Sequence, residues 1–140
     1  MKGSYSMSQF IIATHSYLAD GYKNSINFFN GATNNVHFIN AYVDDQKNFV
    51  EELNGLLEKF KTDQIVILTD MPGGSVNKEA VNLIKDYDCK VISGINLSLV
   101  LELIMNPDDK LSDEAIRLAV NEARKQIIYV NDLLKEEDLE

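Results

Sequence analysis

With 140 residues, 45% of them hydrophobic, the chain is expected to form one domain with an ordinary core. Its formal net charge of −9, from 22 acidic and 13 basic residues, argues against nucleic-acid binding through a broad basic face. The single cysteine, Cys89, excludes an intramolecular disulfide and a cysteine-rich zinc site and is expected to be a buried thiol beside a strand. No apolar run approaches the roughly 18 residues of a membrane span.

The two ends of the chain are expected to lie outside the folded domain, which should span residues 9–131. Residues 1–8 are interpreted as an N-terminal tail, and their Gly-Ser-Tyr-Ser composition suggests that Met7 is the native start and that residues 1–6 were added in cloning. Because this segment lacks the apolar centre of a signal peptide, we expect a cytoplasmic protein. Residues 132–140 are rich in Glu and Asp and predict a solvated acidic tail.

Between these tails, short apolar runs alternate with longer stretches of helical periodicity. Residues 10–13 predict a first strand, after which apolar side chains recur on one helical face until Asn30-Gly31 ends the helix. Residues 36–43 predict a second strand. Asp44 and Asp45 are then expected at the start of a second helix, where the helix dipole favours carboxylates, and they lack the third ligand that a metal site would need.

The second half of the chain repeats this alternation. Residues 65–68 are apolar on both faces, as expected of a parallel strand that helices cover on each side, and residues 90–95 predict a fourth strand. Ser112 is expected to cap the last long helix. Residues 127–130 are β-branched and aromatic and are interpreted as a fifth strand, the alternative being a continuation of the preceding helix.

Alternation of strand and helix predicts a doubly wound α/β domain. We expect a mainly parallel sheet of about five strands with helices on both faces and the strand order 2-1-3-4-5. In that order the carboxyl ends of the first and third strands are neighbours and flank the crevice at which the winding reverses. Ligands of such sheets bind at this crevice, so the functional residues are expected there.

His15 ends the first predicted strand and Asp70 ends the third, so the topology should bring them together. A carboxylate beside a histidine keeps one ring nitrogen protonated and leaves the lone pair of the other free, which makes the histidine an activated nucleophile or base. Taken singly, His15 could merely end a strand and Asp70 could be a turn residue before Pro72. His37, inside the second predicted strand, is interpreted as structural, and the tyrosines are interpreted as packing residues.

Gly73-Gly74-Ser75 follows Asp70 and leads into the next predicted helix. Glycines allow backbone N–H groups to approach an oxyanion, and the helix N-terminus adds a favourable field. The turn is too short for a P-loop and lacks its lysine, and most such triplets are only turns. Beside a histidine and an aspartate, however, it predicts a small cradle for a phosphoryl group.

These motifs resemble those of the EIIA domain of the mannose/fructose/sorbose family of the bacterial phosphoenolpyruvate-dependent sugar phosphotransferase system. The resemblance covers residues 9–130. Its motifs, in order, are Thr14-His15 after the first strand, Leu68-Thr69-Asp70 separated by two residues from Gly73-Gly74-Ser75, Asn77 in the next helix, and Ser93-Gly94-Ile95-Asn96-Leu97 after the fourth strand. The chain departs from the family at Ser16, where members often carry glycine, and at Met71-Pro72 after the aspartate.

The resemblance implies a role for each matching residue. His15 would be the phosphorylated residue, and Asp70 would orient it. The residues that bind the phosphoryl group would be Thr14, Gly73, Gly74 and Ser75.

The resemblance also implies a phosphotransferase that takes a phosphoryl group from the carrier protein HPr and passes it to a separate EIIB protein, and through it to a membrane EIIC/EIID permease. No metal or other cofactor is implied. Some family members are dimers that exchange a C-terminal strand, so we expect a homodimer with residues 127–130 as that strand. Two alternatives stay open, namely the phosphoryl-transfer subunit of a phosphoenolpyruvate-dependent dihydroxyacetone kinase, and a binding module that senses a phosphorylated ligand and turns nothing over.

Overall fold

A four-stranded parallel sheet with the order β2-β1-β3-β4 forms the centre of the domain. The computed structural model describes residues 8–31 and 33–139, so the origin expected for residues 1–6 falls outside the described residues. The α/β class and the order of the first four strands are confirmed. The strands are β1 (Ser8–His15), β2 (Val36–Ala41), β3 (Gln64–Thr69) and β4 (Cys89–Ser93).

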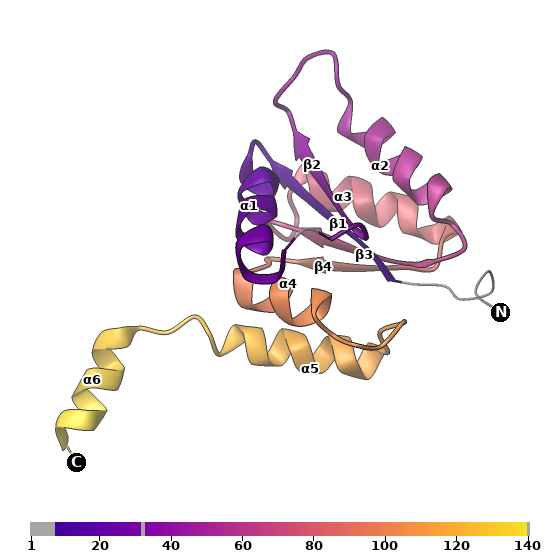
Figure 1. The fold of residues 1–140 in the computed structure, drawn as a ribbon. Coiled ribbons are helices and arrows are strands. Elements are labelled where there is room, and N and C mark those ends of the chain that lie inside the picture. The colour runs from indigo at the N-terminus through magenta and orange to yellow at the C-terminus, as the bar shows by residue number, and fades with distance from the viewer. Residues whose placement is uncertain (1–7, 32, 140) are drawn as a thin grey trace.

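Helices cover both faces of this sheet (Figure 1). Phe10 and Ile12 of β1 pack in one hydrophobic cluster with residues of α1 (Leu18–Asn30), α4 (Leu97–Ile104) and α5 (Asp113–Arg124). Ile11 and Ala13 pack in a second cluster with residues of α2 (Phe49–Lys59) and α3 (Ser75–Leu83), which a short 3-10 helix, η2 (Ile84–Asp86), follows. Burial of each large apolar side chain contributes about 2 kcal/mol, so the strand that carries His15 at its end is firmly held.

The expected fifth strand is wrong. Residues 127–129 form neither strand nor helix, and α6 (Val130–Leu139) follows them and extends away from the body of the domain (Figure 1). The Ile127 side chain is 79% exposed and that of Tyr129 is 67% exposed. β-branched and aromatic residues favour a strand where a neighbouring strand packs against them. The described part of the chain gives residues 127–130 no such neighbour, so their intrinsic preference is not realised.

The start expected for the second helix is also wrong. Asp44 and Asp45 lie in the loop after β2, and α2 begins only at Phe49. Asn48 is the N-cap, and its side chain accepts the Val50 N–H at 2.9 Å. Asp44 instead accepts a backbone N–H within its own turn, which is a common alternative for aspartate.

Two other helix ends follow the sequence prediction. Gly31 ends α1 with a φ of 73°, in the left-handed region that favours glycine. Ser112 caps α5 by accepting the Ala115 N–H at 3.0 Å.

At the N-terminus, Ser8 is expected in the tail but is the first residue of β1 and is buried. Of the helices in the described ranges, none combines the length and the apolar character that crossing a bilayer requires.

Candidate active site

His15 and Asp70 meet at the carboxyl edge of the sheet. β1 and β3 pair in parallel with Ala13 opposite Thr69, so the residues that follow this pair lie side by side. The His15 Nδ1 atom lies 2.9 Å from Oδ2 and 3.1 Å from Oδ1 of Asp70, and the His15 backbone N–H donates to Oδ2 at 2.9 Å. The Asp70 side chain is 10% exposed and that of His15 is 30% exposed, so the imidazole is held on one side and open on the other.

The contact with Asp70 determines which nitrogen of His15 can react. An ionised carboxylate only accepts hydrogen bonds, so Nδ1 carries the ring proton and Nε2 keeps its lone pair. Nε2 lies 3.4 Å from the hydroxyl oxygen of Ser75. The geometry therefore presents a nucleophilic nitrogen next to a hydroxyl group at the start of α3.

The N-terminus of α3 lies against the imidazole of His15. A Cβ added at Gly74 would stand 3.1 Å from Cε1 and 3.7 Å from Nε2 of that ring, so the approach depends on glycine. Gly74 is the N-cap, and no side chain of the described residues caps α3. The first N–H groups of the helix can therefore meet an anion. Gly73 makes the preceding turn with a φ of 76°, a conformation that also favours glycine.

Thr14, the other residue expected to bind a phosphoryl group, contacts the start of α1. Its side chain is fully buried, and its Oγ1 accepts the Ala19 N–H of α1 at 2.8 Å. This bond ties the start of α1 to the end of β1 and so helps to fix the backbone beside His15. The contact gives the Thr14 hydroxyl a structural role, and its expected part in binding a phosphoryl group stays a prediction.

A buried polar cluster lies directly before Asp70 in the chain. The Thr69 hydroxyl is fully buried, 2.8 Å from Ser93 Oγ and 3.2 Å from Asn77 Oδ1. These contacts connect β3 with β4 and α3, which keeps the parts of the site in register. The pKa of Tyr22 is raised mainly by burial and, to a smaller extent, by the negative charge of Asp70.

Ser16, which follows His15, adopts a left-handed backbone conformation with a φ of 55°. Its N–H donates to the Ala41 carbonyl at 2.9 Å, at the adjoining end of β2. This conformation is the one that glycine adopts most easily. At this departure from the resemblance, Ser16 therefore takes a conformation that would suit glycine better.

Tyr42 lies at the site and does more than the packing that the sequence predicts for the tyrosines. It follows the end of β2, and its hydroxyl donates to Ser75 Oγ at 2.7 Å. Its ring centroid lies 5.8 Å from that of His15. The available signal was its position at the carboxyl end of the second predicted strand, which borders the same crevice as the end of the first.

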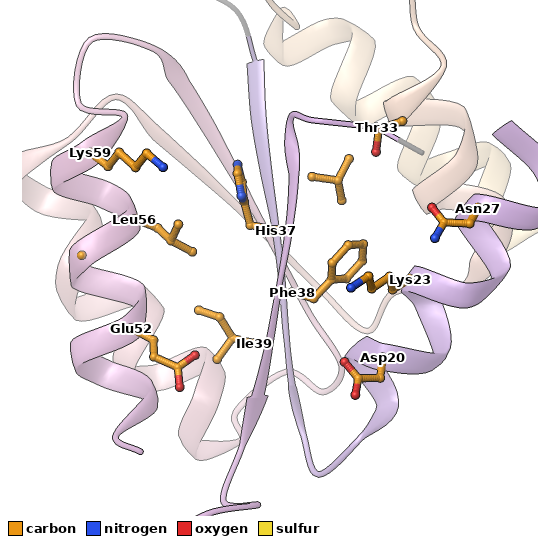
Figure 2. Close-up of a pocket in the computed structure, with 12 residues that line it drawn as sticks. Asp20, Lys23, Asn27, Thr33, His37, Phe38, Ile39, Glu52, Leu56 and Lys59 are labelled. Carbon is orange, nitrogen blue, oxygen red and sulfur yellow. The ribbon is translucent and has the colours of Figure 1, made fainter. Parts of the chain in front are cut away.

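A groove of about 720 Å³ runs along the edge strand β2, away from the site just described. Figure 2 shows it between α1 and α2, with Lys23 and Lys59 on its two sides. His37, in the same groove, approaches Gln9 Oε1 through Nε2 at 3.0 Å and lies against the ring of Phe60, with the ring centroids 4.8 Å apart. These contacts give His37 a structural role. Neither member of the histidine–aspartate pair lines the groove.

The remaining candidate groups for chemistry are less suitable. Burial raises the pKa of the Cys89 thiol to about 12, so this cysteine stays protonated at neutral pH and is a poor nucleophile. Within residues 8–31 and 33–139, no three His, Cys, Asp or Glu side chains are grouped to hold a metal ion. The His15 imidazole is thus the group best placed for covalent chemistry.

Comparisons with known proteins indicate the family of the chain. A family model described as the PTS system fructose IIA component matches residues 9–120. A solved structure described as a phosphoenolpyruvate-dependent sugar phosphotransferase system (PTS) permease from Klebsiella pneumoniae is 27% identical with a TM-score of 0.85, covering 93% of this chain and 96% of its own. No curated protein matches the chain.

Two further solved structures share the fold at lower identity. The PTS IIA protein associated with the fucose utilization operon of Streptococcus pneumoniae has a TM-score of 0.78 at 23% identity, covering 92% of this chain and 97% of its own. The mannose/sorbose specific IIA subunit of Enterococcus faecalis has a TM-score of 0.77 at 18% identity, covering 87% and 93%.

Proposed function

The chain belongs to the EIIA family of sugar phosphotransferase system components, and on this premise we propose that it is a phosphocarrier that holds a phosphoryl group on Nε2 of His15. The observation that carries the proposal is the bond between Nδ1 and Asp70, which leaves Nε2 free. That nitrogen lies beside Ser75 at the N-terminus of α3, where backbone N–H groups favour an anion.

In the transfer step, the lone pair of His15 Nε2 attacks the phosphorus of a phosphohistidine on HPr. A new phosphorus–nitrogen bond forms on Nε2 while the bond to the donor imidazole breaks, and its electron pair returns to the donor. The His15 ring gains positive charge, which the Asp70 carboxylate stabilises. Because the transition state is loose and highly charged, positioning and electrostatic stabilisation account for most of the catalysis.

The oxygens of the phosphoryl group would meet the N-terminus of α3. Gly74 allows close approach, the first N–H groups of the helix donate, and the Ser75 hydroxyl adds a further donor. The same contacts would serve the second transfer, in which a histidine of a separate EIIB protein attacks the phosphorus and His15 leaves. An open site suits both steps, because each reacting partner is a side chain on another protein.

The partners proposed are HPr as donor and EIIB as acceptor, with a membrane EIIC/EIID permease beyond it, all meeting in the cytoplasm. We also propose a homodimer. Ile127, Ile128 and Tyr129 form an apolar segment that is largely exposed between α5 and α6. A second chain would remove it from water.

Incubation with phosphoenolpyruvate, Enzyme I and HPr tests the proposal. The protein should gain one acid-labile phosphate, which can be counted by intact mass. His15→Ala should gain none, and His37→Ala, which removes the other histidine of the chain, should gain one as the wild type does. A wild-type protein without phosphate would indicate a binding module instead. Discharge to a dihydroxyacetone kinase subunit in preference to EIIB would place the carrier in that pathway.

A further inference from the structure

The side chain of Tyr42 lies on an unexpected face of the sheet. Side chains of a strand alternate between faces, and Ile39 and Ala41 of β2 both pack in the cluster under α2 and α3. A regular continuation would therefore turn Tyr42 toward α1. Instead its ring packs edge-on against Phe49 of α2, with centroids 5.3 Å apart, and lies beside His15.

A left-handed backbone at Tyr42 produces this reversal. Its φ is 68°, in a region that a bulky aromatic residue rarely adopts. Such conformations persist where the surrounding structure fixes them, and they gather at functional sites. Here the unusual backbone has a definite result, because it moves the tyrosine ring from the α1 face to the face that holds His15 and Ser75.

The hydrogen bond from Tyr42 limits where the Ser75 proton can point. The Tyr42 hydroxyl donates to Ser75 Oγ at 2.7 Å, so it occupies one acceptor position of that oxygen. A serine hydroxyl has a single proton. Among the described residues, the acceptor recorded within reach of this proton is His15 Nε2 at 3.4 Å, whose lone pair is free because Nδ1 bonds to Asp70. Bonds of this kind are often long before a partner binds.

We propose that Tyr42 is a positioning residue for phosphoryl transfer, whose hydroxyl orients the hydroxyl of Ser75 toward the atom that carries the phosphoryl group. In the resting protein the Ser75 proton points at His15 Nε2. Once the phosphoryl group occupies the Nε2 lone pair, the same proton is directed at a phosphoryl oxygen. No proton changes owner in this exchange, because only the acceptor of the Ser75 hydrogen bond changes.

This inference rests on the proposed function, since it concerns the same site. Tyr42 touches neither the phosphorus nor the attacking nitrogen in this scheme, so its contribution passes entirely through Ser75. The scheme therefore predicts a strict dependence. Loss of the Tyr42 hydroxyl should matter while Ser75 is present and should have no effect once Ser75 is absent.

The test measures single-turnover transfer from phospho-HPr in four proteins: wild type, Tyr42→Phe, Ser75→Ala and the double variant. Tyr42→Phe should slow transfer roughly 3- to 10-fold, the range expected for the loss of one hydrogen bond. Ser75→Ala should be slower, and the double variant should match Ser75→Ala alone. Tyr87→Phe, which removes a hydroxyl that donates to Glu58 at the amino edge of the sheet, opposite the site, is the matched control and should keep the wild-type rate.

A second measurement uses the resting protein. In long-range proton–nitrogen spectra of the His15 imidazole, Tyr42→Phe should shift the Nε2 signal and leave Nδ1 unchanged. Phe keeps the ring that packs on Phe49, so the thermal midpoint should stay near that of the wild type. An Nε2 signal identical to that of the wild type would overturn the inference without reference to any transfer assay.

The rates can contradict the inference in two further ways. An unchanged rate for Tyr42→Phe would show that its hydroxyl has no role. A double variant slower than Ser75→Ala by the full Tyr42→Phe factor would show that Tyr42 acts independently of Ser75. Either result, beside a wild type that accepts phosphate, overturns only the role of Tyr42, whereas a wild type that accepts none overturns the proposed function and this inference together.

Discussion

The Asp70 carboxylate holds His15 at two points at once, because its Oδ2 atom accepts both the backbone N–H and the ring Nδ1 of that residue at 2.9 Å. The backbone bond fixes where the strand end lies, and the ring bond fixes the tautomer and the direction of Nε2. One carboxylate thus sets both the position and the chemistry of the proposed nucleophile. The parallel pairing of β1 with β3 makes this possible for residues 55 positions apart.

Substitution of Asp70 should slow phosphoryl transfer without abolishing it. Asp70→Ala removes the tautomer lock and the negative charge that stabilises the His15 ring as it gains the phosphoryl group. We expect transfer from phospho-HPr to fall roughly a hundred- to ten-thousand-fold, measured by rapid quench. Asp70→Asn keeps a hydrogen-bond acceptor without the charge, and its transfer rate should lie between those of the wild type and Asp70→Ala. Wild-type rates in both variants would reduce Asp70 to a turn residue.

Gly74→Ala should impair transfer more than it impairs folding. The new Cβ would stand 3.1 Å from His15 Cε1, so the imidazole must move away from the N-terminus of α3. The φ of Gly74 is −72°, which alanine adopts without strain. Gly73→Ala is the matched contrast, because its φ is 76° and nothing lies within 4 Å of the added Cβ.

The two alanine variants should therefore differ in kind. Gly73→Ala should lower the free energy of unfolding by about 1–2 kcal/mol through backbone strain, as measured by urea denaturation. Gly74→Ala should unfold near the wild-type midpoint yet transfer phosphate more slowly. Equal transfer rates in Gly74→Ala and the wild type would show that the close approach of α3 to His15 has no functional meaning.

The part of the site that sequence reasoning recovered is the part that strand topology controls. His15 and Asp70 follow two buried strands, and the known order of such sheets makes those strand ends neighbours. Gly74 could be predicted because it lies between Asp70 and the start of the next helix, where an anion would meet free N–H groups. Tyr42 was missed because its role depends on one left-handed residue, which reverses the side chain relative to the alternation that a strand pattern predicts.

Two of the errors in the fold have a similar origin. Residues 127–130 have the composition of a strand, but a strand exists only with a neighbour, and neighbours are set by the whole chain. Aspartate is common at the start of a helix, but its side chain can equally accept a backbone N–H in a turn, as Asp44 does. Asn48 caps α2 instead. Local preference predicts the right element where the hydrophobic pattern agrees with it. It fails where tertiary contacts decide between two possible local structures.

Acidification should destabilise the protein in part through His37. Burial, and then the positive charge of Lys59, lower the pKa of His37 below its ordinary value of 6.5. In the unfolded chain His37 titrates normally, so the unfolded state binds more protons between pH 6.5 and the lower pKa of the folded state. The contribution of His37 to the free energy of unfolding should be constant above pH 6.5. It should decrease as the pH falls below 6.5.

Urea unfolding at several pH values between 5 and 8 measures this effect. His37→Gln is the matched variant, because glutamine can still donate to Gln9 Oε1 but does not titrate. The other ionisable groups are common to both proteins, so the difference between the two curves reports His37. Parallel curves across this range would show that the groove leaves His37 as easy to protonate as in the unfolded chain.

The protein should form a homodimer that depends on the segment after α5. Ile127 and Val130 are 79% and 57% exposed, and Leu134 of α6 is 54% exposed. These residues belong to a segment that extends away from the domain (Figure 1), and exposed apolar side chains that gather in one segment often contact another protein. Deletion after Lys125, where α5 has ended, should convert a dimer into a monomer or an aggregate in sedimentation velocity at micromolar concentration.

Phe28→Ser, at an 82% exposed position of α1, removes a comparable apolar side chain elsewhere and should leave the dimer intact. A full-length protein that sediments as a monomer would show that the segment needs no second chain, and its exposed side chains would then have to meet a different partner.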